Sequence, residues 1–426
     1  MNMSFESLGV SPEIVSMLSK QGISSPFPIQ IATIPDAIAG RDVLGRGQTG
    51  SGKTLAFGLP VLTRLAGRKA KARKPLALVL APTRELAMQI HDALVPLAHK
   101  VGLNSQLIAG GMPYRKQIDA LRAGVPILVA TPGRLMDLME KGEADLSAVE
   151  VVVLDEADQM VDLGFLPAVQ LILNATPSKG QRLLFSATLD KRVQSLVKSY
   201  LKDPVQHSVN TETASVTTMD HHVLVMHPEH KDIVTAQIAA RDGRTLFFVR
   251  TQRGADRLAD KLALQGVPVG SLHGGKSQAV RTRTLNDFRS GETLTLVATD
   301  VAARGIHVDD ISLVVHVDPP ADPKDYLHRA GRTARAGESG TVVTLTTSKQ
   351  KHVVKSLTEK AGVDAAFVRV EPHAKELVSI TGSREPSGVP WHPKPEPSRS
   401  GGSRRDKPKT YGFQHGKKRY GGKRPA

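Results

Sequence analysis

Short apolar runs alternate with longer amphipathic stretches along most of the chain. The runs have the length of buried strands, and they are Leu76–Leu80, Pro126–Ala130, Val151–Leu154, Leu183–Phe185, Thr245–Val249, Leu294–Ala298, Leu313–Val317 and Thr341–Leu345. Stretches of helical periodicity separate them, for example Arg84–His99 and Thr251–Gln265. This alternation predicts an α/β fold in which parallel sheets are covered by helices on both faces.

The periodicity lapses in the middle of the chain and again near its end. Around Pro204–Asp220 the sequence turns to Ser, Thr, Asn and His, which we interpret as a domain boundary. Two domains, 1–207 and 218–376, fit a chain of 426 residues better than one. In the segment 382–426, Pro, Gly and Ser crowd together without an apolar period, which predicts a disordered tail.

The charge of the chain indicates a class of partner. The net charge is +16, and the segment 382–426 supplies more than half of it, with 12 Lys and Arg against 3 Asp and Glu. Such a balance favours a polyanion, either nucleic acid or an anionic membrane surface. Aromatic residues lie among these cations and could stack on unpaired bases; they are Trp391, Tyr411, Phe413 and Tyr420. The alternative is a tail that only aids solubility.

Composition also excludes several classes of protein. The chain has no cysteine, which excludes disulfides, thiol catalysis and Cys-ligated zinc. No apolar run approaches the roughly 20 residues of a spanning helix, which excludes an integral membrane protein. The first ten residues lack the pattern of a secretory signal. We therefore expect a soluble, cytoplasmic protein without a membrane partner.

One segment matches the phosphate-loop pattern G-x-x-x-x-G-K-[ST]. It reads Gly47-Gln48-Thr49-Gly50-Ser51-Gly52-Lys53-Thr54. The glycines let successive backbone N–H groups and a helix N-terminus face the phosphates of a nucleotide. The expected roles are neutralisation of the β and γ oxygens for Lys53 and ligation of magnesium for the Thr54 hydroxyl.

Two further motifs fit hydrolysis of a bound nucleotide. The apolar run Val151–Leu154 ends in adjacent carboxylates, of which Asp155 fits a metal ligand and Glu156 fits the base that orients the attacking water. In the other domain, Arg332 and Arg335 are three residues apart and could direct two guanidinium groups at one ligand. If they reach across from the second domain, hydrolysis requires the two domains to close.

Polar and small residues follow several of the predicted strands directly. Ligands of open α/β sheets bind beyond the carboxyl ends of the strands, so each domain is expected to have one active edge. The segments there are Pro82–Glu85, Thr131–Arg134, Asp155–Asp158, Ser186–Thr188 and Thr299–Asp300.

Taken together, these motifs resemble the DEAD-box ATP-dependent RNA helicases of superfamily 2. The resemblance runs from about Phe5 to Thr347 and includes Gly22–Gln30, similar to the adenine-reading Q motif placed within residues 3–31. In the second half it includes Phe248–Thr251, His273-Gly274, Thr299–Ile306 and His328–Arg335. With the short basic tail, the chain is most similar to the bacterial RhlE-like branch.

The resemblance implies two tandem RecA-like domains with ATP and Mg²⁺ in the cleft between them. Gln30 would read adenine beside Ile23, and Arg332 and Arg335 would be arginine fingers. The residues expected to couple hydrolysis to closure are Asp158, Ser186, Thr188, Asp300 and His328. The residues expected to line a largely sequence-independent RNA track are Thr83, Arg84, Gly111, Thr131, Arg134, Gln278, Arg281 and Thr299.

Three positions depart from the pattern of that family. Ile23 stands where an aromatic residue is more usual, His307 where Asp is common, and Ala334 where Gly is frequent. None of these changes removes a residue needed for phosphate chemistry.

The sequence thus predicts RNA-stimulated ATP hydrolysis that drives separation of short RNA duplexes or remodelling of ribonucleoproteins. Two alternatives stay open: an ATP-gated RNA clamp with negligible unwinding, and a DNA-directed translocase. Protein partners are expected among ribosome-assembly or RNA-decay proteins.

Overall fold

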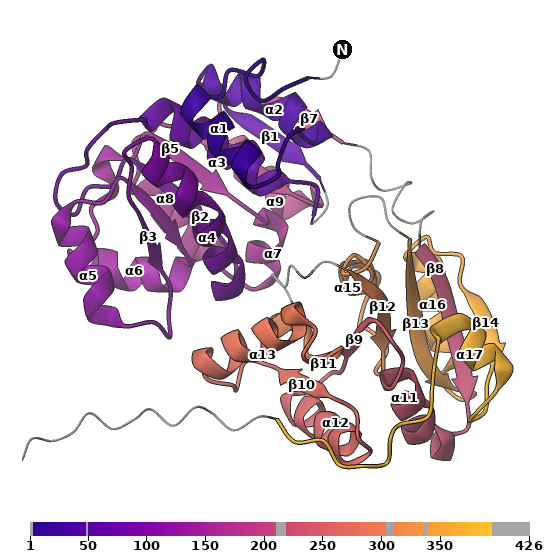
Figure 1. The fold of residues 1–426 in the computed structure, drawn as a ribbon. Helices are drawn as coiled ribbons and strands as arrows, with labels where there is room; N and C mark the ends of the chain where they lie inside the picture. The colour runs from indigo at the N-terminus through magenta and orange to yellow at the C-terminus, as the bar shows by residue number, and fades with distance from the viewer. Residues whose placement is uncertain are drawn as a thin grey trace, which may run out of the picture. The chain divides into compact units, whose positions relative to one another are not determined.

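A computed structural model describes residues 3–47, 50–209, 219–303, 308, 310–334 and 339–393. The described chain up to Trp391 forms one compact unit, which contains two seven-stranded sheets. We name the part from α1 to β7 the first domain and the part from β8 to Trp391 the second domain. Every strand pair in both sheets is parallel (Figure 1).

The first sheet has the strand order β3-β4-β2-β5-β6-β1-β7. Its strands are β1 Val43–Arg46, β2 Ala77–Leu80, β3 Ser105–Ile108, β4 Ile127–Ala130, β5 Val151–Leu154, β6 Gln181–Ser186 and β7 Val205–Ser208. The helices of this domain are α1 Pro12–Lys20, α2 Pro28–Ile38, α3 Lys53–Leu65, α4 Arg84–Lys100, α5 Tyr114–Ala123, α6 Pro132–Glu140, the 3-10 turn η1 Leu146–Ala148, α7 Ala157–Asp162, α8 Leu166–Asn174 and α9 Lys191–Tyr200.

The second sheet repeats the topology of the first. Its order, β10-β11-β9-β12-β13-β8-β14, is that of the first sheet with seven added to each number. Its strands are β8 Met219–Met226, β9 Arg244–Phe248, β10 Val269–Leu272, β11 Thr295–Ala298, β12 Ile311–His316, β13 Gly340–Thr347 and β14 Ala366–Arg369. The helices are η2 Pro228–His230, α11 Lys231–Ala239, α12 Gln252–Leu264, α13 Gln278–Ser290, α14 Asp300–Ala303, α15 Pro323–Ala330, α16 Lys351–Lys360 and α17 Lys375–Thr381.

Each sheet is buried on both faces, which is why its central strands read as continuous apolar runs. In β4, Ile127 and Val129 pack into one core cluster, while Leu128 and Ala130 pack into another on the opposite face. Helices cover both faces of each sheet in Figure 1. The predicted fold class is confirmed, and each of the eight predicted runs contains or overlaps a strand.

The structure shows more regular backbone near both predicted boundaries than the sequence pattern indicated. The polar stretch Pro204–Asp220 contributes β7 at one end and the start of β8 at the other, and residues 210–218 lie outside the described residues. The predicted tail also begins too early. The backbone N–H groups of Gly388 and Trp391 donate to the carbonyl oxygens of Gln265 and Ala263 on the α12 side, at 3.0 and 2.8 Å. In Figure 1 this yellow segment runs from α17 past α11 to α12.

These hydrogen bonds explain the second difference. A segment rich in Ser, Gly and Pro lacks an apolar pattern, but its backbone can still be held by carbonyl groups of neighbouring helices. The rest of the predicted tail, residues 394–426, lies outside the described residues. Among the described residues, no helix is long and apolar enough to cross a membrane.

Candidate functional site

The phosphate loop connects the end of β1 to the start of α3. Gly50 and Gly52 have φ of +89° and +88°, a left-handed conformation that residues with a Cβ rarely adopt. The buried Lys53 donates from Nζ to the carbonyl oxygen of Gly47 at 2.9 Å. Among the described residues, no side chain caps the N-terminus of α3. This end of the helix has the geometry that binds phosphate oxygens. The predicted loop residues Gln48 and Thr49 lie outside the described residues.

Gln30 connects the Q motif to this loop. Its Oε1 accepts from the backbone N–H of Phe27 at 2.8 Å, and its Nε2 donates to the carbonyl oxygen of Gly52 at 2.9 Å. A Cβ on Gly52 would lie 2.5 Å from that Nε2. Gln30 thus braces the phosphate loop directly, a contact that the sequence reasoning did not predict. Ile23 is half-buried and packs against the core of the first domain.

Phe27 is a second feature of this region that sequence reasoning missed. Its side chain stays 45% exposed, and its Cδ2 would lie 2.9 Å from a Cβ built on Gly52. An exposed aromatic ring therefore lies beside the phosphate loop. A Pro-Phe-Pro sequence at the start of α2 was the signal available for it.

The acidic motif and the Ser-Ala-Thr motif form one hydrogen-bonded unit. Asp158 accepts at Oδ2 from both the backbone N–H and the hydroxyl of Thr188, each at 2.9 Å. The backbone N–H of Asp158 donates to Ser186 Oγ at 3.3 Å, and that hydroxyl donates to the Thr188 carbonyl oxygen at 2.7 Å. The ends of β5 and β6 are thereby held together. The structure therefore brings together the three residues of the first domain that were predicted to couple.

Asp155 and Glu156 lie at the end of β5 and are both buried. Burial raises the pKa of Asp155 to about 7, although the charge of Lys53 opposes this shift. Asp155 Oδ1 accepts from the backbone N–H of Glu156 at 3.0 Å. Glu156 has φ +51° and ψ +52°, a left-handed conformation that costs a non-glycine residue about 1–2 kcal/mol. Such strain tends to occur at functional sites because the surrounding structure must hold it in place.

Arg329 organises the corresponding edge of the second domain. Its guanidinium donates to both carboxylate oxygens of Asp300, at 2.5 and 2.8 Å, and to the Asp318 carbonyl oxygen at 2.8 Å. It also lies over the ring of Phe248, 5.1 Å from the centroid. The side chain is buried. Arg329 thus ties helix α15 to the ends of β9, β11 and β12, a role that was not predicted.

The predicted arginine fingers follow α15. Arg332 is buried and His328 is half-buried, whereas Arg335 lies outside the described residues. Ala334 has φ +52°, in the left-handed region that favours glycine. The departure His307 also lies outside the described residues.

The RNA residues predicted in the first domain lie at the carboxyl ends of β2, β3 and β4. Thr83 caps α4 by accepting from the Leu86 N–H at 3.3 Å, and Arg84 begins that helix. The Arg84 guanidinium covers Gly111, because a Cβ there would lie 2.5 Å from Arg84 Nη1. Thr131 occupies the N-cap position of α6 without a capping hydrogen bond from its side chain, and the guanidinium of Arg134 lies 4.7 Å from the ring centroid of Tyr114.

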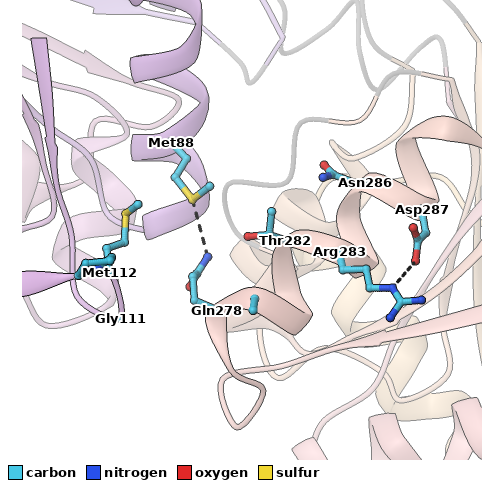
Figure 2. Close-up of a pocket in the computed structure, with 10 residues that line it drawn as sticks. Met88, Gly111, Met112, Gln278, Thr282, Arg283, Asn286 and Asp287 are labelled. Carbon is cyan, nitrogen blue, oxygen red and sulfur yellow. Dashed lines mark hydrogen bonds and ion pairs between the residues drawn. The ribbon is translucent and has the colours of Figure 1, made fainter. Parts of the chain in front are cut away.

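Two RNA residues predicted in the second domain contact Glu85 of the first. Arg281 donates from Nε to Glu85 Oε1 at 2.8 Å, and Gln278 donates from Nε2 to the same oxygen at 3.1 Å. Thr299 is buried where β11 meets α14. A cavity of about 520 Å³ lies beside Gln278, with Met88 and Met112 on the first domain and α13 on the second (Figure 2). The two predicted halves of the track therefore meet at Glu85.

Comparison with known proteins agrees with this arrangement. The DEAD/DEAH box helicase family matches residues 27–196, and the family named helicase conserved C-terminal domain matches residues 229–337. The ATP-dependent RNA helicase RhlB of Xanthomonas oryzae pv. oryzae is 40% identical over 387 residues, covering 89% of this chain and 67% of that protein. The DEAD-box ATP-dependent RNA helicase 53 of Oryza sativa subsp. japonica is 38% identical over 426 residues, covering 97% and 67%.

The fold is also found in solved helicase structures. Saccharomyces cerevisiae Dbp5 bound to RNA and ADP BeF3 superposes with a TM-score of 0.77 at 30% identity, covering 86% of this chain and 95% of that chain. Sequence families, relatives and topology agree along both sheets, and the chain belongs to the DEAD-box family of ATP-dependent RNA helicases.

Proposed function

We propose that this protein hydrolyses ATP in response to RNA and uses the cycle to separate short RNA duplexes or to remodel ribonucleoproteins. The observation that carries the proposal is the link between Asp158 and Thr188, at 2.9 Å. It joins the segment after β5, which carries Asp155 and Glu156, to the segment after β6 at the same edge of the sheet. A change at the phosphate can therefore be transmitted to the neighbouring loop, as an ATP-driven conformational cycle requires.

The residues at the phosphate loop have distinct proposed roles. Lys53 neutralises the β and γ oxygens of ATP, and Glu156 orients the attacking water. Arg332 and Arg335 stabilise the charge that develops on the transferring phosphoryl group. Gln30 holds the loop through Gly52 and reads adenine.

The donor set beside the loop fits magnesium. Mg²⁺ prefers oxygen ligands and is usually held by one or two carboxylates together with substrate phosphates. The Asp155 carboxylate and the Thr54 hydroxyl are such oxygen donors, at the end of β5 and in the first turn of α3. When bound, the ion would neutralise phosphate charge, and it would favour the ionised form of Asp155 against the burial that raises its pKa.

We propose that RNA crosses both domains along the predicted track without a base-edge code. Arg84, Arg134 and Arg281 supply cations, while Gly111 admits the backbone closely. The basic segment 394–426 adds a non-specific tether for RNA. We further propose that the protein is cytoplasmic and belongs to the RhlE-like branch. Its protein partners are proposed to be ribosome-assembly or RNA-decay proteins.

The test is the steady-state ATPase rate without nucleic acid, with single-stranded RNA and with single-stranded DNA of the same sequence. Strong stimulation by RNA alone is expected. Equal stimulation by DNA would favour a translocase, and a high rate without either would contradict RNA gating. A strand-displacement assay on a short duplex separates a helicase from an RNA clamp.

Two variants connect the rate to the proposed site. Lys53→Ala and Glu156→Gln are each expected to abolish turnover, because one removes the phosphate cation and the other removes a base that typically contributes about 10²–10⁴-fold. Normal turnover in either variant would contradict the assignment of the site.

A further inference from the structure

Helix α15 contacts both domains, each through a different face. Tyr326, Arg329 and Ala330 are buried within the second domain and fix the helix on its own sheet. Lys324 and His328 are four residues apart, so they lie together on a different face. From this second face, Lys324 contacts the first domain. Arg332 follows the C-cap residue of the helix.

Lys324 contacts two carboxylates of the first domain. Its Nζ lies 2.8 Å from Asp162 Oδ2 and 3.0 Å from Asp162 Oδ1, and 3.3 Å from Asp190 Oδ2. The Lys324 side chain is 31% exposed, and that of Asp162 is 14% exposed. The pair is therefore partly shielded from solvent.

The two carboxylates are themselves held in place. Asp190 caps α9 by accepting at Oδ1 from the backbone N–H groups of Arg192 and Val193, at 3.0 and 2.9 Å. Asp162 also accepts from the Arg192 guanidinium at 2.9 Å. Because these acids are positioned by other contacts, they offer Lys324 a prepared site.

Both carboxylates flank the coupling unit of the first domain. Asp162 lies four residues after Asp158 on α7, and Asp190 lies two residues after Thr188. The Lys324 amine therefore contacts one acid that follows Asp158 in the chain and one that follows Thr188. The helix that precedes Arg332 thus contacts the end of α7 and the N-cap of α9, close in sequence to the residues proposed to couple hydrolysis to closure.

We propose that Lys324 is a positioning residue that docks α15 onto the first domain through Asp162 and Asp190, so that Arg332 reaches the nucleotide. This inference rests on the proposed role of Arg332 as an arginine finger. Lys324 touches neither ATP nor RNA in this scheme. It stabilises the closed arrangement in which hydrolysis occurs, and its removal should lower kcat more than it raises KM for ATP.

Charge variants of Lys324 test the proposal. At saturating RNA, Lys324→Ala is expected to lower kcat about 2- to 5-fold, the range of a partly exposed ion pair. Lys324→Glu places a third carboxylate beside the other two and should lower kcat by about tenfold or more. Lys324→Arg keeps a cation and should stay within about twofold of the wild-type rate.

Two further variants separate docking from a general effect of charge. Lys360→Glu makes the same change in charge at an exposed position at the end of α16 and should leave kcat unchanged. Asp162→Lys combined with Lys324→Glu reverses the pair and should recover at least about threefold over Lys324→Glu alone. A pair of fluorophores, one on each domain, should report reduced closure with ATP and RNA in Lys324→Glu and recovery in the reversed pair.

Three experimental results would contradict the proposal. A wild-type kcat in Lys324→Glu, an equal loss in Lys360→Glu, or no recovery in the reversed pair would each overturn the docking role. None of these results would affect the loss of turnover expected for Lys53→Ala. Failure of this inference is therefore distinguishable from failure of the proposed function.

Discussion

The Glu85 carboxylate on α4 accepts a hydrogen bond from Arg281 Nε on α13 at 2.8 Å, although the two residues lie 196 positions apart and in different domains. Their side chains are only 4% and 12% exposed. Gln278 donates to the same carboxylate oxygen. The two domains therefore share one buried ion pair at the place where the proposed RNA track crosses between them.

Removing one partner of this pair should weaken the closed state. Glu85→Ala leaves the Arg281 guanidinium without its carboxylate, and a truncated buried charge pair typically costs about 2–5 kcal/mol. Because the pair joins the two domains, this free-energy cost should disfavour the closed arrangement of the domains. We expect at least a tenfold weaker RNA affinity in the presence of a non-hydrolysable ATP analogue, measured by fluorescence anisotropy.

A double-mutant cycle provides the control for this prediction. If the two residues act together, Glu85→Ala combined with Arg281→Ala should lose less affinity than the two single losses added together. Strictly additive losses would mean that the residues act separately on RNA.

Gln30→Glu should weaken nucleotide binding although the two side chains have nearly the same shape. Glutamate can still accept from the Phe27 N–H, but it cannot donate to the carbonyl oxygen of Gly52. Two oxygens would then face each other across a distance now spanned by a hydrogen bond of 2.9 Å. Titration with a fluorescent ATP analogue should show a loss of about tenfold or more, since an unsatisfied buried group costs about 1–3 kcal/mol.

The same titration with Gln30→Ala separates two explanations. That variant removes the brace without introducing a repulsion, so it should bind nucleotide more tightly than Gln30→Glu. Equal affinity of Gln30→Glu and the wild type would show that the brace does not support the loop.

The features of the fold and the site that could be predicted from the sequence are those whose residues lie next to one another in the chain. Central strands such as β5 were predicted because burial on both faces leaves a continuous apolar run. The edge strand β7, Val-Gln-His-Ser, was missed because its burial alternates and its polar residues resemble a linker. The phosphate loop and the acidic motif were recognisable because their residues are contiguous.

Contacts between distant segments carried no such local signal. Glu85 is one of several acids at a helix start, and only the folded chain brings it to Arg281. Lys324 likewise reads as a surface lysine until the structure places it between Asp162 and Asp190. Arg329 lay within a recognised motif, but its bidentate contact with Asp300 was not evident from spacing.

Asp155→Asn should stabilise the nucleotide-free protein at high pH. Burial raises the pKa of Asp155 from 3.8 to about 7. Between these values the folded protein keeps a proton that the unfolded chain has released, so stability falls as pH rises through this window. Asparagine is neutral at every pH and can still accept from the Glu156 N–H.

Thermal unfolding without nucleotide or Mg²⁺ measures this effect. The Tm advantage of Asp155→Asn should be larger at pH 8 than at pH 5, by about 2–4 °C for each kcal/mol relieved. The same variant should lose turnover, because it lacks the proposed metal ligand. A Tm difference that is the same at both pH values would contradict the burial of an ionisable Asp155.

Gly45→Ala should destabilise the first domain although alanine suits a strand better than glycine. Gly45 on β1 pairs with Phe185 on β6, and an added Cβ would lie 2.5 Å from Cε1 of that ring. The ring cannot retreat easily, because it is buried and packs against Phe57 with centroids 5.5 Å apart. Overpacking of this kind costs about 1–3 kcal/mol.

The matched control is Gly133→Ala on α6, where an added Cβ meets nothing within 4 Å. This change should leave stability unchanged or raise it by about 0.5–1 kcal/mol, because glycine weakens a helix relative to alanine. Urea unfolding of the nucleotide-free protein measures both. Equal stability of Gly45→Ala and the wild type would mean that β1 shifts to accept the methyl group. In that case the phosphate loop that follows β1 should also move, and nucleotide affinity would fall instead.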